Sequence, residues 1–569
     1  MGVACNEDKP INSGGDSGKD NPTPETVTEI NGTKIDATMN AVGLVADATT
    51  GKGIPGVPVT DGYNYVVTDA NGVYQMKANM YTRKIYLSLP AGYQVPLDGQ
   101  THRPTFFSTT AFDYKNMNRN DFTLVKDATL SDDFTLVMIG DPQCQYQKYV
   151  DRYVQETVPD IAKYVANEKD VYCVTLGDII FDSSDLWDEM AASMSNVKLA
   201  SGRYLPFFQC IGNHDHDAKQ SNDYKATANY VNHFGPTDYS FNRGKAHIIV
   251  MDDVVCTTPK SNSSPNGCTW NYNAGFSEAQ YKWLKQDIEN VKDRENMVVM
   301  LCCHIPFRAG ASTGGSSVNS DKKYDEVLSL LTQFKEAHLM IGHTHYNQNY
   351  IHKGYVCKGG QPIYEHVHGA ACGAWWSCNS NVYGAPNGYS VYKVEGAGIT
   401  DWKLKGTGRD EAYQMRVYDG NQTYSGTKGY VYNWYNASNY GGSSSIKAIG
   451  NASFKGAFVA DIFGDDDSNW KVEMYQNGVK IGDFQRIPNG GSCNVMAAAY
   501  FFNELGKNTD TWTNKTASHY WYYRPASGMP ATETNWEVRA THLIPYPSPE
   551  AGVTHTYSCS SLTTDYSVF

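Results

Sequence analysis

The hydrophobic and polar positions along the chain fall into three successive patterns. The first, over residues 27–127, consists of short alternating runs at 42–45, 53–59 and 68–74 that are separated by Gly and Asn turn residues. Alternation with a period of two residues between turn signals is typical of short strands. We therefore expect this segment to form a small β-sandwich, in which nothing indicates catalytic chemistry.

The second pattern, over residues 128–398, alternates fully apolar runs with amphipathic helical segments. The predicted buried face of the first helix is formed by Val150, Val154, Ile161 and Val165. Ser277 and Gln280 have the spacing of a capping box at the start of a second helix, and a third is expected over 322–334. Apolar strands that alternate with helices predict a layered α/β domain.

From residue 399 to 569 the chain returns to short strand patterns that are rich in Tyr and Trp. Residues 470–475 and 479–481 flank Asn477-Gly478, a pair that favours a tight β-hairpin turn. We expect a carboxy-terminal β-rich domain. The predicted organisation is therefore multi-domain, with a linker at 1–26, a β-sandwich at 27–127, an α/β domain at 128–398 and a β-rich domain at 399–569.

Size and charge narrow the classes of function. The chain has 569 residues, of which 41% are hydrophobic, and a net charge of -13 from 47 basic and 60 acidic residues. This balance provides no broad cationic face for nucleic acid or anionic lipid, so a nuclease is disfavoured and no nucleic-acid partner is expected. No run approaches the roughly 18 apolar residues that would cross a bilayer.

The first residues suggest a membrane tether of a different kind. Residues 1–4 followed by Cys5 resemble the end of a lipoprotein signal, with Cys5 as the lipidated residue and 12–18 as a flexible polar linker. We therefore predict an exported lipoprotein, located in the periplasm or on the outer membrane or cell surface. An incidental cysteine near the start explains the same residues, and this alternative stays open.

The cysteines agree only weakly with export. Two pairs that lie close together in predicted loops, Cys256 with Cys268 and Cys372 with Cys378, would be able to form disulfides in an oxidising compartment. The sequence does not decide between disulfides and free thiols.

Metal-capable side chains follow the ends of five apolar runs. Asp141 and Gln143 follow the run 134–139, Asp178 follows 171–176, and Asn213 and His214 follow 205–210. His304 follows the run 297–303, and His343 and His345 follow 338–341. Open α/β sheets place their ligand sites at the carboxyl ends of strands. Glycine stands before the ligands in four of the five cases, as expected where the backbone turns sharply beside a bound ion. The pattern predicts a metal site formed from all five runs.

At this point the sequence resembles a known family. The residues Asp141, Gly177-Asp178, Gly212 to Asp215, His304 and Gly342 to His345 match, in order, the motifs of the calcineurin-like metallophosphoesterase superfamily. The three-part layout is similar to an exported bacterial type with a β-sandwich before the catalytic domain and a β domain after it. The resemblance implies a central α/β four-layer sandwich, and the amino-terminal strands resemble transthyretin-like, immunoglobulin-like or carboxypeptidase-regulatory-like modules.

The resemblance also implies a dinuclear centre in which Asp178 is the carboxylate shared by two cations. One cation would bind Asp141, Gln143, Asp178 and His345, and the other would bind Asp178, Asn213, His304 and His343. A hydroxide that bridges the cations would attack phosphorus in line. His214 would protonate the leaving oxygen or stabilise developing charge, and Asp215 would hold its ring.

Two positions depart from the family pattern. Gln143 stands where members commonly carry His, and its neutral oxygen is a harder ligand that favours manganese, magnesium or iron over zinc. A similar Asp-x-Gln motif occurs in branches that resemble manganese-dependent ADP-ribose and CDP-alcohol diphosphatases, so we expect two divalent ions with manganese favoured. Phe181 stands where purple acid phosphatases carry a metal-binding Tyr, which argues against a purple iron–tyrosinate site.

The remaining candidates have simpler alternative explanations. Arg308 would clamp a phosphate, although a surface arginine fits equally well. Trp375 and Trp376 would either line a substrate cleft or pack the catalytic domain against its neighbour. The residues expected to support the motifs or to form turns, rather than to bind metal, are His216, Asp217 and Asp182.

The sequence therefore predicts a metal-dependent phosphoester hydrolase that acts on a small-molecule, glycan-linked or lipid-linked phosphoester. The Asp-x-Gln resemblance slightly favours a diester or a nucleotide-like pyrophosphate, but the choice between monoester and diester stays open. Two alternatives remain. A catalytically inactive surface module that binds phosphorylated glycan predicts lost metal ligands, and a nuclease predicts a basic surface.

Overall fold

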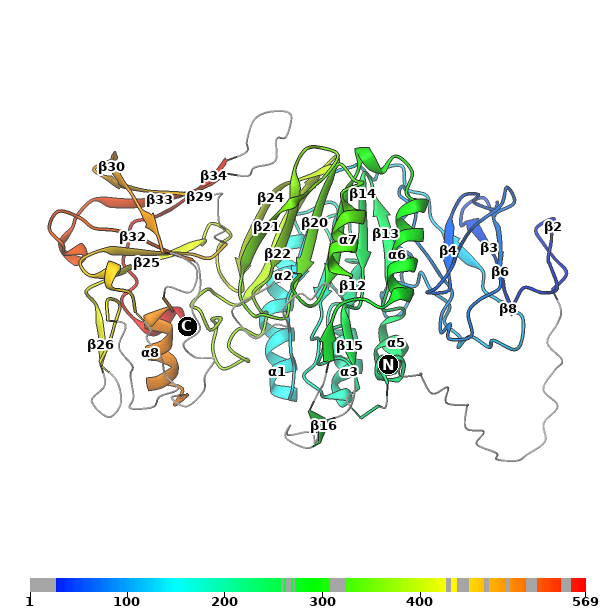
Figure 1. The fold of residues 1–569 in the computed structure, drawn as a ribbon, viewed down its shortest axis with the longest axis horizontal. Coiled ribbons are helices and arrows are strands. Elements are labelled where there is room, and N and C mark those ends of the chain that lie inside the picture. Colours follow the sequence, from blue (N-terminus) through cyan, green and yellow to red (C-terminus); the bar gives the residue numbers. More distant parts are fainter. Residues whose placement is uncertain are drawn as a thin grey trace, which may run out of the picture.

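The computed structural model describes residues 27–217, 219–220, 222–256, 260–261, 268–269, 272–307, 323–425, 431–436, 450–464, 470–487, 492–507, 519–543 and 554–569. These residues form three bodies in a row, with the amino-terminal strands (blue) and the carboxy-terminal strands (yellow to red) on opposite sides of a central α/β domain (Figure 1). The predicted linker with Cys5 and the candidate phosphate clamp Arg308 lie outside the described residues.

Two sheets form the central domain. The five-stranded sheet has the order β12 (Phe207–Cys210), β11 (Val171–Leu176), β10 (Phe134–Ile139), β23 (Gly388–Glu395) and β24 (Gly398–Gly406). The six-stranded sheet has the order β13 (Tyr239–Arg243), β14 (Ala246–Val250), β19 (Val298–Cys303), β20 (Glu336–Ile341), β22 (Pro362–Val367) and β21 (Gln348–Val356). Strands β10, β11 and β12 are parallel, as are β14, β19, β20 and β22. The carboxyl ends of the five strands that precede predicted ligands therefore meet at common sheet edges.

The two sheets pack face to face, and helices cover their outer faces. Phe208 of β12 stacks on Phe241 of β13, with ring centroids 4.2 Å apart, across the interface between the sheets. Along β10 the side chains alternate, because Met138 joins the core between the sheets whereas Val137 joins the core beneath the outer helices. The helices are α1 (Gln147–Arg152), α2 (Val158–Val165) and α3 (Trp187–Ala192) on the five-stranded sheet, and α6 (Glu278–Asn290) and α7 (Tyr324–Leu331) on the six-stranded sheet (Figure 1).

Shorter elements complete the central domain. They are the helices α4 (Asp223–Ala226) and α5 (Ala228–Phe234) and the strand pairs β15 (Val254–Cys256) with β18 (Tyr272–Ala274) and β16 (Lys260–Ser261) with β17 (Cys268–Thr269). The predicted capping box begins α6, since Ser277 Oγ accepts the N–H of Gln280 and Gln280 Oε1 accepts the N–H of Ser277. The third predicted helix is present as α7, within the predicted range 322–334.

The first predicted helix is interrupted by a π-helical turn. Tyr153–Thr157 form this turn between α1 and α2. A π-helical turn is wider than an α-helical one, so it rotates the side chains relative to the regular period of 3.6 residues. As a result Val154 is exposed, contrary to the prediction, and Tyr153 is buried beside it. The other predicted positions, Val150, Ile161 and Val165, are buried.

The predicted boundary between residues 398 and 399 falls inside a β-hairpin. β23 and β24 are paired from Gly388↔Gly406 to Glu395↔Gly398, and β23 also pairs with β10. The central sheet therefore extends to Gly406, beyond the predicted end of the catalytic domain. The alternating pattern predicted strands here, but it did not reveal which sheet they join.

Small sheets form the amino-terminal body. The first sheet contains β6 (Val73–Met76), β3 (Ala41–Asp47) and β8 (Asn118–Arg119), and β9 (Phe122–Leu124) also pairs with β3. The second has the order β5 (Tyr65–Val67), β4 (Pro58–Thr60) and β7 (Tyr86–Leu87). The third is the pair β1 (Glu29–Ile30) and β2 (Thr33–Lys34). The predicted strand at 68–74 begins only at Val73, because the Asp69 side chain accepts the N–H groups of Asn71 and Val73 and forms a turn. The predicted strand at 53–59 begins only at Pro58.

The amino-terminal body docks on α6 through polar contacts. Tyr65 Oη donates to Asp287 Oδ1 at 2.8 Å, and Trp283 Nε1 donates to Thr60 Oγ1 at 3.1 Å. Trp283 is fully buried between the two bodies. The segment is therefore attached to the catalytic domain by buried hydrogen bonds as well as by apolar packing.

Two four-stranded sheets form most of the carboxy-terminal body. The first sheet has the order β25 (Met415–Asp419), β28 (Phe458–Ile462), β32 (Tyr520–Tyr523) and β31 (Gln485–Arg486). The second has the order β30 (Val479–Asp483), β29 (Trp470–Gln476), β33 (Trp536–Leu543) and β34 (Thr554–Cys559). Phe458 and Met474, from different sheets, belong to one hydrophobic core. The predicted hairpin is confirmed, since β29 pairs with β30 and both Asn477 and Gly478 have positive φ, at 49° and 78°. The helix α8 (Val495–Asn503) and the pair β26 (Thr423–Ser425) and β27 (Val431–Asn433) pack in a second core.

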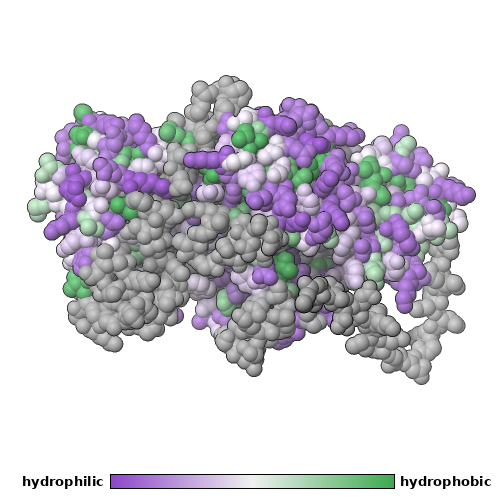
Figure 2. All heavy atoms as spheres, in the orientation of Figure 1, coloured by the Kyte–Doolittle hydropathy of each residue, from purple (hydrophilic) through white to green (hydrophobic). Residues whose placement is uncertain are grey.

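The surface in Figure 2 is mostly hydrophilic over the central domain, and its hydrophobic side chains lie in small separate groups. Within the described residues no helix has the length and apolar character needed to cross a membrane. Cys372 and Cys378 are buried free thiols, so this pair does not form the disulfide that the sequence left open. Cys256 is also a free thiol.

Candidate metal centre

All seven predicted metal ligands lie just beyond the carboxyl ends of five strands. Asp141 and Gln143 follow β10, Asp178 follows β11, Asn213 follows β12, His304 follows β19, and His343 and His345 follow β20. Six of these side chains belong to buried residues, and His343 is half-buried. The strands of both sheets therefore deliver the predicted ligands to one place.

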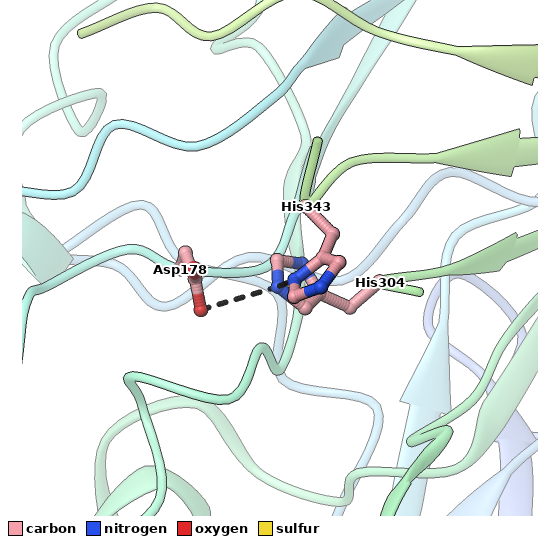
Figure 3. A group of neighbouring side chains, drawn as sticks. All are labelled: Asp178, His304 and His343. Atoms are coloured by element: carbon pink, nitrogen blue, oxygen red, sulfur yellow. Dashed lines mark hydrogen bonds and ion pairs between the residues drawn. The ribbon is translucent and has the colours of Figure 1, made fainter. Parts of the chain in front are cut away.

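One group of ligand atoms lies around His304. Figure 3 shows the side chains of Asp178, His304 and His343 gathered at one point, and one ligand atom of each lies within 4.8 Å of the others. His304 Nε2 is 3.3 Å from Asp178 Oδ1 and 3.1 Å from Asn213 Oδ1. His343 Nδ1 is 3.2 Å from the same His304 nitrogen. These four residues are the set predicted for one cation.

A second group lies around Asp141. Oδ1 of Asp141 is 3.5 Å from His345 Nε2, and Gln143 Nε2 donates to Asp178 Oδ2 at 2.7 Å. Gln143 Oε1 and His345 Nδ1 are buried and have no hydrogen-bond partner in the described part of the chain. A buried polar atom without a partner costs roughly 1–3 kcal/mol. Both atoms are therefore well suited to binding a cation.

Asp178 contacts both groups, through different oxygens. Its Oδ1 faces His304 and also accepts the backbone N–H of His214 at 2.9 Å, whereas its Oδ2 accepts the hydrogen bond from Gln143. A carboxylate with one oxygen directed to each group has the geometry of a ligand shared by two cations.

The backbone at the ligands adopts an unusual conformation. The φ angles are 44° at Asp141, 43° at Gln143, 50° at Asp178, 69° at His343 and 61° at His345. Positive φ is uncommon for residues other than glycine, and each instance costs of order 1–3 kcal/mol. Five of the seven predicted ligands share this conformation, so the surrounding structure holds them in place at a cost in stability.

Two of the glycines in the motifs are required by space. A Cβ atom at Gly177 would lie 2.5 Å from His304 Nδ1, and a Cβ atom at Gly212 would lie 2.2 Å from the backbone nitrogen of Asp178. The sequence attributed these glycines to sharp turns. Close packing of the ligand-bearing loops against one another is a further reason for them.

Burial and local charge prepare three of the predicted ligands, His343, His345 and Asp178, for a cation. Burial, assisted by the charge of His304, lowers the pKa of His343 to about 3, and burial lowers the pKa of His345 to about 4. Both imidazoles are therefore uncharged at neutral pH, which is the form that binds metal. Burial opposes the charged form of Asp178, but the nearby His304 and His214 outweigh it and hold the pKa of Asp178 below its usual value.

Three family models match the chain in order along the sequence. "N terminal of Calcineurin-like phosphoesterase" matches residues 39–127, "Calcineurin-like phosphoesterase" matches 134–347, and "C terminal of Calcineurin-like phosphoesterase" matches 365–544. The chain belongs to the calcineurin-like phosphoesterases. The middle match contains all seven predicted ligands, and membership of this family supports a metal-dependent phosphoester hydrolase.

The other comparisons add less to the assignment of this phosphoesterase. A solved structure described as "Structure of PhoD" is 12% identical, covers 62% of this chain and 79% of its own, and superposes with a TM-score of 0.32. Similarity at this level carries no functional argument. No curated protein matches the chain.

His214 lies at the edge of the metal centre of the phosphoesterase, with its side chain 20% exposed. Its Nδ1 is 3.1 Å from Asp182 Oδ1, and its ring stacks on Phe181 with centroids 4.0 Å apart. Burial alone would lower the pKa of His214, but the charge of Asp178 and the contact with Asp182 raise it. Because Nδ1 is directed to Asp182, Nε2 is the atom that can meet a substrate oxygen.

Asp215 does not hold the ring of His214, contrary to the prediction. Its carboxylate is buried and accepts the backbone N–H groups of Ile179, Ile180 and Gly212 at 2.9, 3.1 and 2.8 Å. Asp215 thereby ties the turn after β11 to the turn after β12. The contact with the His214 ring that was predicted for Asp215 is made by Asp182 instead. The prediction was wrong because neighbouring side chains in a turn point in different directions, which sequence adjacency does not reveal.

Replacing Asp215 with Ala is expected to destabilise the central domain. Three buried N–H groups would lose their acceptor, and since each unsatisfied group costs roughly 1–3 kcal/mol we expect a loss of at least about 3 kcal/mol. Thermal unfolding measures the change, with Asp151→Ala as the control because Asp151 is exposed and has one exposed contact. A variant of normal stability with reduced activity would restore the predicted role of Asp215 in catalysis.

The two tryptophans differ in their surroundings. The ring of Trp375, which is half-buried, lies 5.0 Å from the ring of His345, so a contact with substrate stays a prediction. Trp376 is 4% exposed, and its Nε1 donates to the carbonyl of Pro142 at 2.8 Å. Of the two roles that the sequence left open for Trp376, lining a substrate cleft does not fit this burial. Its indole is inside the domain and supports the turn between the two ligands that follow β10.

Asp253 supports the metal centre and was not predicted. Its carboxylate accepts the N–H groups of His304 and Ile305 at 3.0 and 3.1 Å and the hydroxyl of Tyr324 at 3.2 Å. Asp253 therefore fixes the turn that carries His304. A signal was present in the sequence, because the apolar run 248–251 ends in two aspartates in the same way as the other runs end in predicted ligands.

Proposed function

We propose that the phosphoesterase hydrolyses its substrate with two divalent cations held side by side. The observation that carries this proposal is the carboxylate of Asp178, which directs one oxygen towards each of two ligand groups. The residues that would hold one cation are Asp141, Gln143, Asp178 and His345, and those that would hold the other are Asp178, Asn213, His304 and His343.

The donor atoms suit such cations. They combine carboxylate oxygens, amide oxygens and imidazole nitrogens, of which those of His343 and His345 are uncharged at neutral pH, and two of the donor atoms are buried without a hydrogen-bond partner in the described chain. When bound, the cations would lower the pKa of a water molecule that attacks phosphorus in line and would neutralise the charge of the phosphate.

We assign proton donation to His214. Asp182 holds Nδ1 and Phe181 supports the face of the ring, so the imidazole is fixed while Nε2 can approach the oxygen of the leaving group. The contact with Asp182 and the charge of Asp178 favour the protonated ring. A positioned imidazolium of this kind is a general acid.

Manganese is the cation that this site favours in our proposal, with iron, magnesium and zinc as the other candidates. Gln143 supplies a neutral oxygen at a position where an imidazole would favour softer metals. Its Oε1 is the buried atom without a partner, so it can bind a metal.

We propose a small-molecule, glycan-linked or lipid-linked phosphoester as the substrate, with a diester or pyrophosphate slightly favoured. The net charge of -13 supports a substrate other than nucleic acid. The location in our proposal is outside the cytoplasm, with Cys5 as a lipid anchor, and the residues 1–5 support it.

An inactive binding module is the alternative from another class of function. Loss of activity in this family would be expected to leave gaps among the metal ligands, whereas all seven positions carry ligand-capable side chains that converge. The active hydrolase is therefore the better explanation of the geometry.

Metal removal and replacement test the proposal. We expect a chelator to abolish hydrolysis of matched aryl phosphate monoesters and diesters and manganese to restore it, because water activation depends on the cations. Initial rates on the two substrates measure both the metal requirement and the preference for monoester or diester.

Asn213→Ala and His214→Ala serve as controls, since one removes a proposed ligand and the other a proposed acid. With the same manganese loading, Asn213→Ala should be far less active than the unchanged chain on both substrates, whereas His214→Ala should lose activity to the extent that the leaving group needs a proton. Hydrolysis that persists without metal, or that is unchanged in both variants, would contradict the proposal.

A further inference from the structure

A second cluster of metal-capable side chains lies behind the loop that carries His214. One ligand atom each of His216, Asp223 and Cys256 lies within 4.8 Å of the others. These residues come from three separate segments, namely the loop that carries His214, the first turn of α4 and the end of β15. None of them belongs to the metal centre described above, and the sequence predicted that His216 would not bind metal.

His216 is prepared to offer Nε2 to a cation. Its Nδ1 donates to the carbonyl of Gly212 at 2.9 Å, which fixes the ring and leaves Nε2 as the coordinating nitrogen. Nε2 lies 3.2 Å from Asp252 Oδ2, and the side chain of His216 is fully buried. Without a proton or a cation, a nitrogen lone pair would face a carboxylate oxygen there, which is unfavourable.

The surroundings concentrate negative charge. Asp252 lies beside Asp223, Asp238 lies beside Asp252, and the three line a cavity of about 190 Å³ between the amino-terminal body and the central domain. Burial, followed by the charge of Asp252, raises the pKa of Asp223 to about 6. The positive groups that line the same cavity are Lys84 and Arg83, and the guanidinium of Arg83 is already bonded to the Tyr224 carbonyl and the Thr227 hydroxyl.

We propose that His216, Asp223 and Cys256 bind one further divalent cation, with the Asp252 carboxylate as the fourth ligand. One imidazole nitrogen, one thiolate and two carboxylate oxygens form a donor set that suits zinc in a four-coordinate site. Binding of the cation releases two protons to solvent, one from the Cys256 thiol, because the thiolate is the form that coordinates, and one from His216 Nε2, whose place beside Asp252 the cation takes.

The cation would join the catalytic loop to a strand pair that contacts the metal centre. His216 is two residues from His214, and Cys256 of β15 pairs with Tyr272 of β18. The ring of Tyr272 lies edge-on to His343, with centroids 6.2 Å apart. The site therefore has a structural role, which is to fix the proton donor and one wall of the metal centre relative to each other.

Cobalt substitution tests the proposal in the full chain. After metal removal and loading with Co²⁺, we expect a near-ultraviolet absorption band from thiolate-to-cobalt charge transfer, since none of the seven ligands of the dinuclear centre is a thiol. Cys256→Ser should abolish the band and reduce the bound metal by one ion per chain. Cys559→Ser is the matched control, because Cys559 is also a half-buried free thiol, and it should retain the band.

Asp178→Asn separates this site from the proposed dinuclear centre. The band should persist in that variant, whether or not hydrolysis does, so failure of one proposal leaves the other testable. Absence of the band in the unchanged chain, or its persistence in Cys256→Ser, would overturn the site.

Alkylation of the unchanged chain covers the case in which Cys256→Ser fails to fold. Iodoacetamide modification at Cys256, followed by peptide mass spectrometry, should be slowed by Zn²⁺ while modification at Cys559 is not. Equal rates at Cys256 with and without Zn²⁺ would overturn the proposal.

Discussion

Replacing Asp178 with Asn is expected to lower kcat/KM by about 10³-fold or more, because losing several kcal/mol of electrostatic stabilisation costs a factor of ten for each 1.4 kcal/mol or so. Asp178 contacts both ligand groups, so the change removes a negative charge that both cations would share. The amide has nearly the same shape as the carboxylate. The NH2 group of the amide, however, would take the place of Oδ2 and cannot accept the hydrogen bond that Gln143 gives there.

The bound metal and the steady-state rates should be measured on the same preparation. We expect both to fall, because a shared ligand affects both cations. Asp185→Asn is a suitable control, since Asp185 lies seven residues further along in an exposed 3₁₀ turn and removes the same charge from the surface. An Asp178→Asn variant that keeps its full activity would refute the shared-ligand role.

The convergence of the seven candidate metal ligands could be predicted from the sequence because of a simple physical rule. Parallel strands that are buried on both faces appear as continuous apolar runs, and their carboxyl ends meet at one edge. His304 and Asp178 are far apart in the sequence, yet each directly follows such a run or its glycine. The rule required no knowledge of side-chain direction, and the seven residues converge as it predicted.

The supporting contacts depend on side-chain direction, and the sequence did not reveal it. Asp215 is next to His214 in the chain, but its carboxylate turns inwards to three backbone N–H groups, and Asp182 meets the imidazole from another loop. Trp376 is next to the half-buried Trp375 but is buried under the turn at Pro142. Trp375 and Trp376 have positive φ, a conformation that local sequence preferences do not predict, whereas the direction of Asp215 is set by the three N–H groups that it accepts.

Regular periodicity failed where the backbone was irregular. Val154 was assigned to the buried face of a regular α-helix, and the π-helical turn at Tyr153–Thr157 moved it to the surface. The end of the catalytic domain was misplaced for a different reason. Strand β24 has the alternating pattern of the carboxy-terminal strands, but it pairs with β23 in the central sheet, a long-range choice that tertiary contacts decide.

Replacing His214 with Ala is expected to lower kcat by roughly 10²- to 10⁴-fold for a substrate with an alkoxide leaving group, the usual contribution of general acid catalysis. His214 offers Nε2 at the edge of the metal centre while Asp182 and Phe181 hold its ring. A phenolate with electron-withdrawing groups departs without a proton, so the loss should be much smaller with an activated aryl phosphate. Steady-state rates on a series of aryl and alkyl esters measure the difference.

The dependence on the leaving group distinguishes proton donation from charge stabilisation. If His214 only stabilised charge on the phosphoryl oxygens, its loss would slow all esters of the series by a similar factor, whatever their leaving group. Asp182→Asn provides the matched variant, because the amide oxygen can still accept the Nδ1–H bond while the charge is lost. We expect it to lower the rates in the same order of substrates but by less than His214→Ala, since the ring stays supported by Phe181. A uniform loss across the series in both variants would remove His214 from the role of proton donor and leave it as an electrostatic contact.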